Sequence, residues 1–186
     1  MSDARALPGG FDVIPLESES LHLRPMGAGD FAALTMAASD PGIWAGHPST
    51  DRYKPEVFRP YFEALLAAGG TLIAQGPDGQ AIGMSRYYAS ADAPGGIGIG
   101  FTFLVRAHWG GQTNFEMKRL MLDHLFGAVE EAWFHIAPTN IRSQKATGKL
   151  GAERMDDRVL DLGTGPADWV RMRLTRPQWQ ARLASR

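Results

Sequence analysis

Apolar and polar residues repeat with two different periods in the N-terminal third of the chain. Residues 21–26 alternate at every second position, as a half-buried strand does. Apolar residues then recur at helical spacing over residues 31–38, with Asp30 as the expected N-cap, and again from Pro55 to the glycine pair at 69–70. Residues 40–53 contain two prolines and two glycines, which are typical of loops. The pattern predicts a strand and two helices, with a loop between the helices.

Strands and helices are predicted to alternate in the remainder of the chain. Residues 71–75 and 81–88 indicate a hairpin around a tight turn. The elements predicted after it are a strand at 97–105, the longest helix at 115–130, a strand at 133–137, a helix at 141–150, strands at 155–162 and 169–174 around the turn 163–166, and a short helix from Pro177. This order predicts an α/β fold with one mixed, mostly antiparallel sheet and helices on both faces.

Length and charge narrow the class of protein. The 186 residues suit a single domain, residues 1–186, in which 1–18 form a loose lead-in. The 19 Lys and Arg nearly balance the 20 Asp and Glu without a basic run, which argues against nucleic acid as the main ligand. No apolar run has membrane-spanning length, and no signal peptide is evident. We therefore expect a cytoplasmic protein that does not contact a membrane.

The residue types that are absent exclude several chemistries. The chain has no cysteine, so disulfides, thiolate metal sites and a covalent thiol nucleophile are excluded together. Its five histidines show no metal-ligand spacing. No metal site is expected.

Two strand-to-helix junctions carry the candidate chemistry. At the first, a predicted strand runs through Gly110–Gly111 into the long helix, and at the second a strand runs through Asn140 into a polar helix. Helix N-termini present free backbone N–H groups and a positive dipole end, which attract phosphate. Asn140 is also an ordinary N-cap residue, and the two roles are compatible. Together the junctions indicate a long, phosphate-bearing cofactor held across an open sheet edge.

These two junctions, together with the element order, resemble the GNAT superfamily of acetyl-CoA-dependent N-acetyltransferases. The resemblance covers residues 21–179, is densest over 97–152, and is greatest to the branch that contains ribosomal-protein N-terminal acetyltransferases. It implies that the strand at residues 99–105 splays from its neighbour and pairs with the pantetheine arm, and that residues 109–114 wrap the pyrophosphate. The residues implied in acetyl-CoA binding are Phe103, Leu104, Val105, Arg106, Trp109, Gly110, Gly111, Gln112, Thr113, Asn114, Asn140, Ser143 and Lys145.

Several of these residues depart from the family pattern or have a second interpretation. Gln112 and Asn114 stand where the superfamily's loop usually has glycine or alanine, and Asn114 is then expected to cap the long helix. Arg106 either pairs with phosphate, which we favour, or covers the sheet edge. Lys145 either reaches the phosphates or is a solvated surface lysine.

Four residues are the candidates for acid–base catalysis. The tyrosine usual in other branches is missing from residues 146–149, which leaves Ser143 as the proton donor to the departing thiolate. Glu116 and His135 are candidate bases, as is Asp51, although none has a specific sequence signal and Glu116 also suits dipole compensation.

The resemblance implies an N-acetyltransferase that transfers acetyl directly to an amine in a ternary complex. The acceptor is a protein N-terminus, a small-molecule amine or an antibiotic, and a homodimer is left open. One alternative is a GNAT fold that binds CoA without turnover, which Gln112 and Asn114 favour. Another, a nucleotide-phosphate enzyme, lacks the glycine-rich motifs that such enzymes use.

Overall fold

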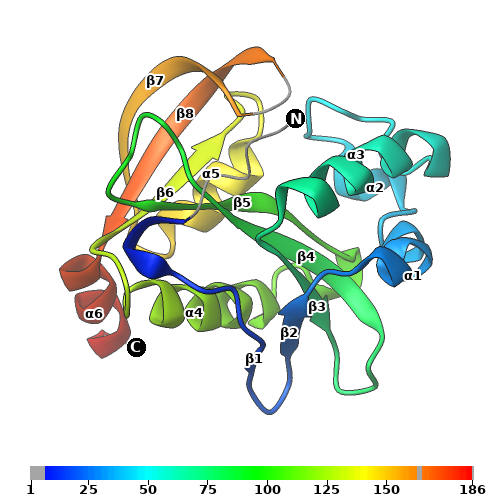
Figure 1. The fold of residues 1–186 in the computed structure, drawn as a ribbon, viewed down its shortest axis with the longest axis horizontal. Helices are drawn as coiled ribbons and strands as arrows, with labels where there is room; N and C mark the ends of the chain where they lie inside the picture. The colour runs from blue at the N-terminus through cyan, green and yellow to red at the C-terminus, as the bar shows by residue number, and fades with distance from the viewer. Residues whose placement is uncertain (1–6, 163–164, 186) are drawn as a thin grey trace.

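The computed structural model describes residues 7–162 and 165–185, and it contains one mixed sheet with helices on both faces (Figure 1). Within these residues the sheet has eight strands in the order β1-β2-β3-β4-β5-β6-β8-β7. Their bounds are β1 Leu16–Glu17, β2 His22–Pro25, β3 Thr71–Gln75, β4 Ala81–Tyr88, β5 Ile97–Leu104, β6 Glu131–Ile136, β7 Glu153–Asp161 and β8 Pro166–Thr175. All neighbouring strands are antiparallel except β5 and β6. The predicted fold class is confirmed.

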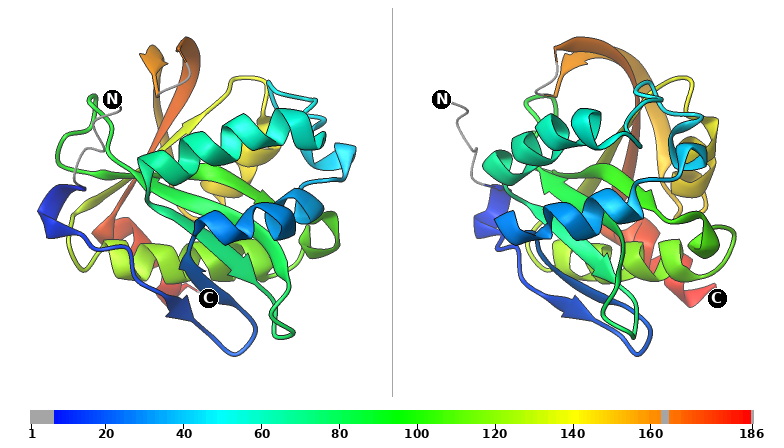
Figure 2. Two further views of the ribbon diagram at one scale, coloured as in Figure 1. Left: turned by 45° about the vertical axis from the view of Figure 1, so that its right-hand side comes forward. Right: turned by 90° about the vertical axis from the view of Figure 1, so that its right-hand side faces the viewer.

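Helices cover the sheet from two sides (Figure 2). Their bounds are α1 Phe31–Ala37, α2 Pro41–Trp44, α3 Pro55–Ala68, α4 Thr113–Leu125, α5 Ile141–Gly148 and α6 Arg176–Ala184, with short 3-10 turns η1 Pro8–Gly10, η2 Ala28–Asp30 and η3 Arg106–His108. One core packs α1, α2 and α3 on the sheet, and it contains Phe58, Met84 and Phe103. The other packs α4 and α6 on the opposite face, around Met117 and Trp179.

The central strands β5 and β6 diverge after a short contact. They are parallel and pair only at Ile97 with Ala132 and at Gly98 with Trp133. β5 continues for six further residues, to Leu104, without a strand on that edge. The splayed central pair implied by the resemblance is confirmed, and the sheet is open between the carboxyl ends of β5 and β6.

Some predicted boundaries and caps were wrong. Asp30 does not cap α1 with its side chain; instead it closes η2 by accepting from the Gly27 N–H and pairs with Arg24. The predicted loop 40–53 contains α2, because Asp40 accepts from the Gly42 N–H and Pro41 starts a turn of helix.

The helix predicted at 115–130 also needs correction. It spans Thr113–Leu125, so Asn114 lies inside its first turn rather than at the N-cap. Apolar residues continue to Val129 after the helix has ended, which extended the prediction too far. It is also shorter than α3, which has 14 residues against 13. Residues 163–164 of the predicted turn lie outside the described residues.

None of the described helices has the length and apolar character needed to cross a membrane. Among residues 7–162 and 165–185, no group of three or more His, Cys, Asp or Glu side chains is arranged to hold a metal ion.

Candidate functional site

The opening between β5 and β6 leads directly to two helix N-termini. β5 continues through η3 and residues 109–112 into α4, and β6 continues through residues 137–140 into α5. Because the two strands are parallel, their carboxyl ends and the helix starts that follow lie at the same edge of the sheet. The first turns of both helices have backbone N–H groups without intrahelical partners. This edge is therefore suited to an anionic ligand.

The loop before α4 is shaped by glycine and anchored by an indole. Gly110 has φ +73°, a left-handed conformation that favours glycine, and a Cβ added at Gly110 or Gly111 would meet no heavy atom within 4 Å. The Trp109 Nε1–H donates to the Leu104 carbonyl over 2.8 Å. The guanidinium of Arg142, in the first turn of α5, stacks 3.8 Å from the centre of the Trp109 ring. The two junctions are thus joined to each other.

The start of α5 is capped as predicted. Asn140 Oδ1 accepts from the Ser143 N–H over 3.1 Å, which confirms Asn140 as the N-cap. Ser143 is half-buried, and its hydroxyl makes no hydrogen bond to the described part of the chain. Lys145 is exposed. The hydroxyl of Ser143 is consequently free to face a ligand at this edge.

The structure gives Arg106 a protein partner. Its guanidinium pairs with Asp40, which precedes α2, and hydrogen bonding to Arg106 lowers the pKa of that carboxyl. Nearby, His108 Nδ1 lies 3.1 Å from Thr113 Oγ1 and so braces the loop base against α4. Arg106 thus ties the loop to the start of α2. This contact agrees better with the second interpretation of Arg106, that it covers the sheet edge, than with phosphate binding.

A bulge interrupts the pairing of β5 with β4 near the opening. The register shifts between Met84 and Arg86, and opposite this shift Phe101 has φ +53°. It is the one non-glycine residue with positive φ in the described part of the chain. Such strain persists where the surroundings enforce it, and it is common at functional sites. The bulge takes Phe101 and Thr102 out of the regular pairing with β4, in the part of β5 whose other edge is free.

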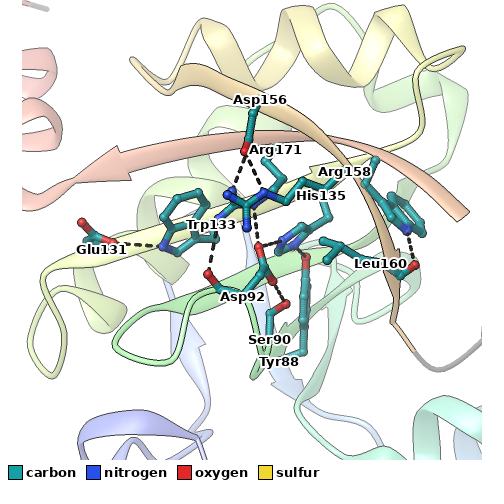
Figure 3. Close-up of polar contacts among 11 residues, drawn as sticks. Tyr88, Ser90, Asp92, Glu131, Trp133, His135, Asp156, Arg158, Leu160 and Arg171 are labelled. Atoms are coloured by element: carbon teal, nitrogen blue, oxygen red, sulfur yellow. Dashed lines mark hydrogen bonds and ion pairs between the residues drawn. The ribbon is translucent and has the colours of Figure 1, made fainter. Parts of the chain in front are cut away.

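Buried polar residues from four segments meet where β5 and β6 begin to diverge (Figure 3). The Tyr88 hydroxyl lies 2.8 Å from His135 Nδ1, and His135 Nε2 lies 3.2 Å from Asp92 Oδ2. Arg171 Nε on β8 lies 2.5 Å from the same carboxylate oxygen, and Ser90 also donates to Asp92. A side chain at position 98 would strike the Tyr88 ring, since a Cβ on Gly98 would lie 2.4 Å from it.

Burial determines how the groups of this network titrate. Desolvation lowers the pKa of His135 despite the opposing effect of Asp92, and it raises the pKa of Tyr88. For Asp92, burial acts to raise the pKa, but hydrogen bonds from Ser90 and His135 and the charge of Arg171 lower it overall. His135 is therefore neutral at pH 7, with its proton on Nε2 facing the carboxylate and Nδ1 accepting from Tyr88.

The structure separates the three predicted catalytic residues. His135 belongs to the buried network, and Ser143 lies at the start of α5. Glu116 is on α4, where it accepts hydrogen bonds from Ser18 and Ser20 that lower its pKa and hold the N-terminal segment. The other candidate base, Asp51, forms an exposed ion pair with Lys54. Asp92 and Arg171 were missed, because nothing in their local sequence marks them.

The segment between α2 and α3 adds an aromatic and cationic cluster that was also not predicted in this form. The guanidinium of Arg52 lies 3.8 Å from the centre of the Tyr61 ring and 5.3 Å from that of Trp44. His47 Nε2 is 3.3 Å from Arg52, and burial followed by the charges of Arg52 and Arg142 lowers the pKa of His47 to about 4. The cluster is thus cationic through its arginines, with a neutral imidazole.

A family model and several solved structures are similar to this chain. Residues 20–153 match the family model described as "Acetyltransferase (GNAT) domain". No protein in the comparison with curated sequences matches the chain significantly. A GCN5-related N-acetyltransferase from Brucella melitensis has a similar structure, with a TM-score of 0.77 and 15% identity over 93% of this chain and 85% of that one.

Two further structures hold ligands. RimJ from Mycobacterium smegmatis, in complex with CoA-disulfide, has a TM-score of 0.65 and 19% identity over 96% of each chain. The aminoglycoside acetyltransferase AAC(6')-Ib, in complex with coenzyme A and kanamycin, has a TM-score of 0.63 and 24% identity over 87% of this chain and 98% of that one. At these identities the likeness concerns the fold.

Proposed function

The chain belongs to the GNAT acetyltransferase family, and we propose that it transfers the acetyl group of acetyl-CoA to a primary amine by direct attack in a ternary complex. The observation that carries the proposal is the open edge between β5 and β6, flanked by the N-termini of α4 and α5. An extended pantetheine arm has the length and polarity to pair with the free edge of β5 over residues 103–105. Its pyrophosphate then lies at Gly110–Gly111 and the start of α4.

In this proposal the chain acts mainly by positioning the two substrates. It contains no cysteine to carry an acyl intermediate, so the amine attacks the thioester itself. Holding the amine against the carbonyl, and aiming a backbone N–H of the bulged β5 at the carbonyl oxygen, are the effects with the largest expected contribution. The Ser143 hydroxyl is the proton donor to the sulfur. His135 accepts the proton of the amine through Tyr88, to which its Nδ1 is bonded.

The charges beside β5 favour some acceptors over others. Arg52, Arg86 and Arg142 have hydrogen bonds to neutral groups and no ion pair with a carboxylate among the described residues. Burial lowers the pKa of each, but they remain cationic at neutral pH. A polycationic antibiotic would be repelled by this surface. We therefore place a peptide N-terminus, whose α-amine deprotonates near neutral pH, ahead of polyamines as the acceptor.

Two measurements test the proposal. Calorimetric titration should show binding of CoA and acetyl-CoA at micromolar strength, and no heat with either at millimolar concentration would overturn it. A thioester-consumption assay should then show turnover with peptide α-amines above that with kanamycin. Binding of CoA without consumption of acetyl-CoA across the amine panel would favour the alternative of a CoA-binding module.

A further inference from the structure

A lysine is buried beneath the bulge of β5. Lys118, on the sheet-facing side of α4, is 6% exposed. Its Nζ lies 2.8 Å from Ser85 Oγ on β4 and 2.7 Å from Thr102 Oγ1 on β5, and these two hydroxyl oxygens are 2.8 Å apart. The three side chains thus form a closed polar triangle between α4 and the sheet, in which Lys118 and Ser85 are buried.

No opposite charge compensates this lysine. Among the described residues Lys118 has no ion pair, and burial lowers its pKa to about 7. The nearby titratable groups make hydrogen bonds to other partners than Lys118. Tyr87 on β4 donates to the Met121 carbonyl, and Glu116 on α4 accepts from Ser18 and Ser20 in the N-terminal segment. From β6, the core on this side receives the apolar residues Phe134 and Ile136.

The triangle is a poor stabilising device. A methionine could occupy the same space without the desolvation of an ammonium group, and replacing buried charges by apolar groups is often neutral or favourable. Stability therefore does not explain why a lysine is buried here, and the position of the triangle next to the opening in the sheet indicates a functional role.

Thr102 connects the buried amine to the opening in the sheet. It is exposed although its hydroxyl contacts Lys118, and it follows Phe101 at the bulge opposite β4, in the part of β5 whose other edge has no strand partner. A charged ammonium only donates, so both hydroxyl oxygens accept from it. With Ser85 donating to Thr102 Oγ1, the hydrogen of Thr102 is directed at the Gly100 carbonyl 3.3 Å away, and a ligand in the opening takes it in place of this long hydrogen bond.

Resting on the proposed function, we infer that Lys118 is a positioning residue that orients the Thr102 hydroxyl toward the sulfur of coenzyme A and stabilises the thiolate as it departs. Thr102 donates a hydrogen bond to the sulfur when the bond between sulfur and the acetyl carbon breaks. Lys118, one hydrogen bond behind, strengthens that donor, because the negative charge of the developing thiolate favours the protonated form of the buried amine. Neither residue forms a covalent bond with the substrate or loses a proton to it.

The state of the thiol in bound coenzyme A tests this role without turnover. Its ionisation would be followed by the ultraviolet absorbance of the thiolate in wild type, Lys118→Met and Thr102→Val. Lys149→Met, at an exposed lysine beyond α5, is the matched control. We expect both site variants to raise the pKa of the bound thiol by about one unit or more, a tenfold loss of thiolate, and the control to leave it unchanged. An unchanged thiol in a folded Lys118→Met protein overturns the inference.

Steady-state kinetics give the second readout. Lys118→Met should lower the turnover number about tenfold or more and leave KM for acetyl-CoA nearly unchanged, because the interaction forms only as the thiolate develops. A purely structural lysine would alter the melting temperature and not the thiol. If wild type binds no CoA, the proposed function fails and the inference with it. If wild type binds CoA but acetylates no amine, the thiol measurement still decides the inference.

Discussion

At the scale of single residues, Arg171 is held by two carboxylates of very different exposure. The side chains of Arg171 and Asp92 are 5% and 6% exposed, whereas that of Asp156, which pairs with the other side of the guanidinium at 2.7 Å, is 38% exposed. We predict that Asp92→Asn destabilises the protein by about 3–5 kcal/mol, since it leaves a buried cation short of its counter-charge. Asp156→Asn should destabilise the protein far less, because the carboxylate of Asp156 is solvent-exposed. Urea unfolding of both variants checks this, and equal losses would contradict it.

In the glycine loop, a substitution at Gly111 should weaken ligand binding without destabilising the fold. Gly111 has an ordinary φ and open space around its missing Cβ, while Gly110 needs its positive φ. Gly111→Val should therefore leave the melting temperature close to that of the control Gly29→Val, another glycine with open space. It should weaken CoA binding by about tenfold or more, because the added side chain occupies the space of the pyrophosphate. Unchanged affinity in the folded variant would show that the loop is an ordinary turn.

The residues that sequence alone could not indicate are those whose role depends on partners far along the chain. Lys118 is buried because Ser85 and Thr102 accept its hydrogen bonds from 33 and 16 residues away. Asp92 and Arg171 are 79 residues apart. In contrast, Asn140 could be predicted, because an N-cap and the N–H it serves lie within three residues.

At the scale of elements, the start of α5 combines a cap with a free hydroxyl in one helical turn. Asn140→Ala should destabilise the protein by about 1 kcal/mol, the usual effect of a lost cap. Ser143→Ala should change stability by less than about 0.5 kcal/mol, because its hydroxyl makes no bond to the described residues. If Ser143 protonates the thiolate, that variant should lose about a hundredfold in turnover.

Both variants would be measured on the same preparations for melting temperature, CoA affinity and turnover number. Turnover of Ser143→Ala within about threefold of wild type would retire its role as acid. Asn140→Ala serves as the control, because it disturbs the start of α5 without removing the Ser143 hydroxyl.

Element boundaries were predictable where local chemistry defines them and were wrong where it does not. Pro55 and Gly69 delimit α3 because proline suits the first helical turn and Gly69 adopts φ +69° after the last. The end of α4 was placed too late, since the apolar residues that follow it still contact the core after the helical hydrogen bonds stop. The four-residue α2 is too short to produce a helical period.

At the scale of the whole molecule, the sheet separates two cores and brings the site to the one place where its strands part. The mixed sheet could be predicted from the order of elements, and its splay from the family resemblance. The insertion of β8 between β6 and β7 could not, because pairing of distant strands is set by register across the sheet.

The buried lysine in one of these cores should make global stability depend on pH in an unusual direction. The pKa of Lys118 is about 7 in the folded protein, well below its ordinary value, so the unfolded chain binds more protons between pH 7 and about 10.4. Stability should therefore rise with pH through this window. From pH 7 to pH 9 the wild type should gain about 2 kcal/mol relative to Lys118→Met, whose apolar side chain does not titrate. The Lys149→Met control should follow wild type, because its lysine is exposed. Denaturant unfolding at both pH values measures the difference, and parallel curves for wild type and Lys118→Met would mean that the buried amine keeps its ordinary pKa.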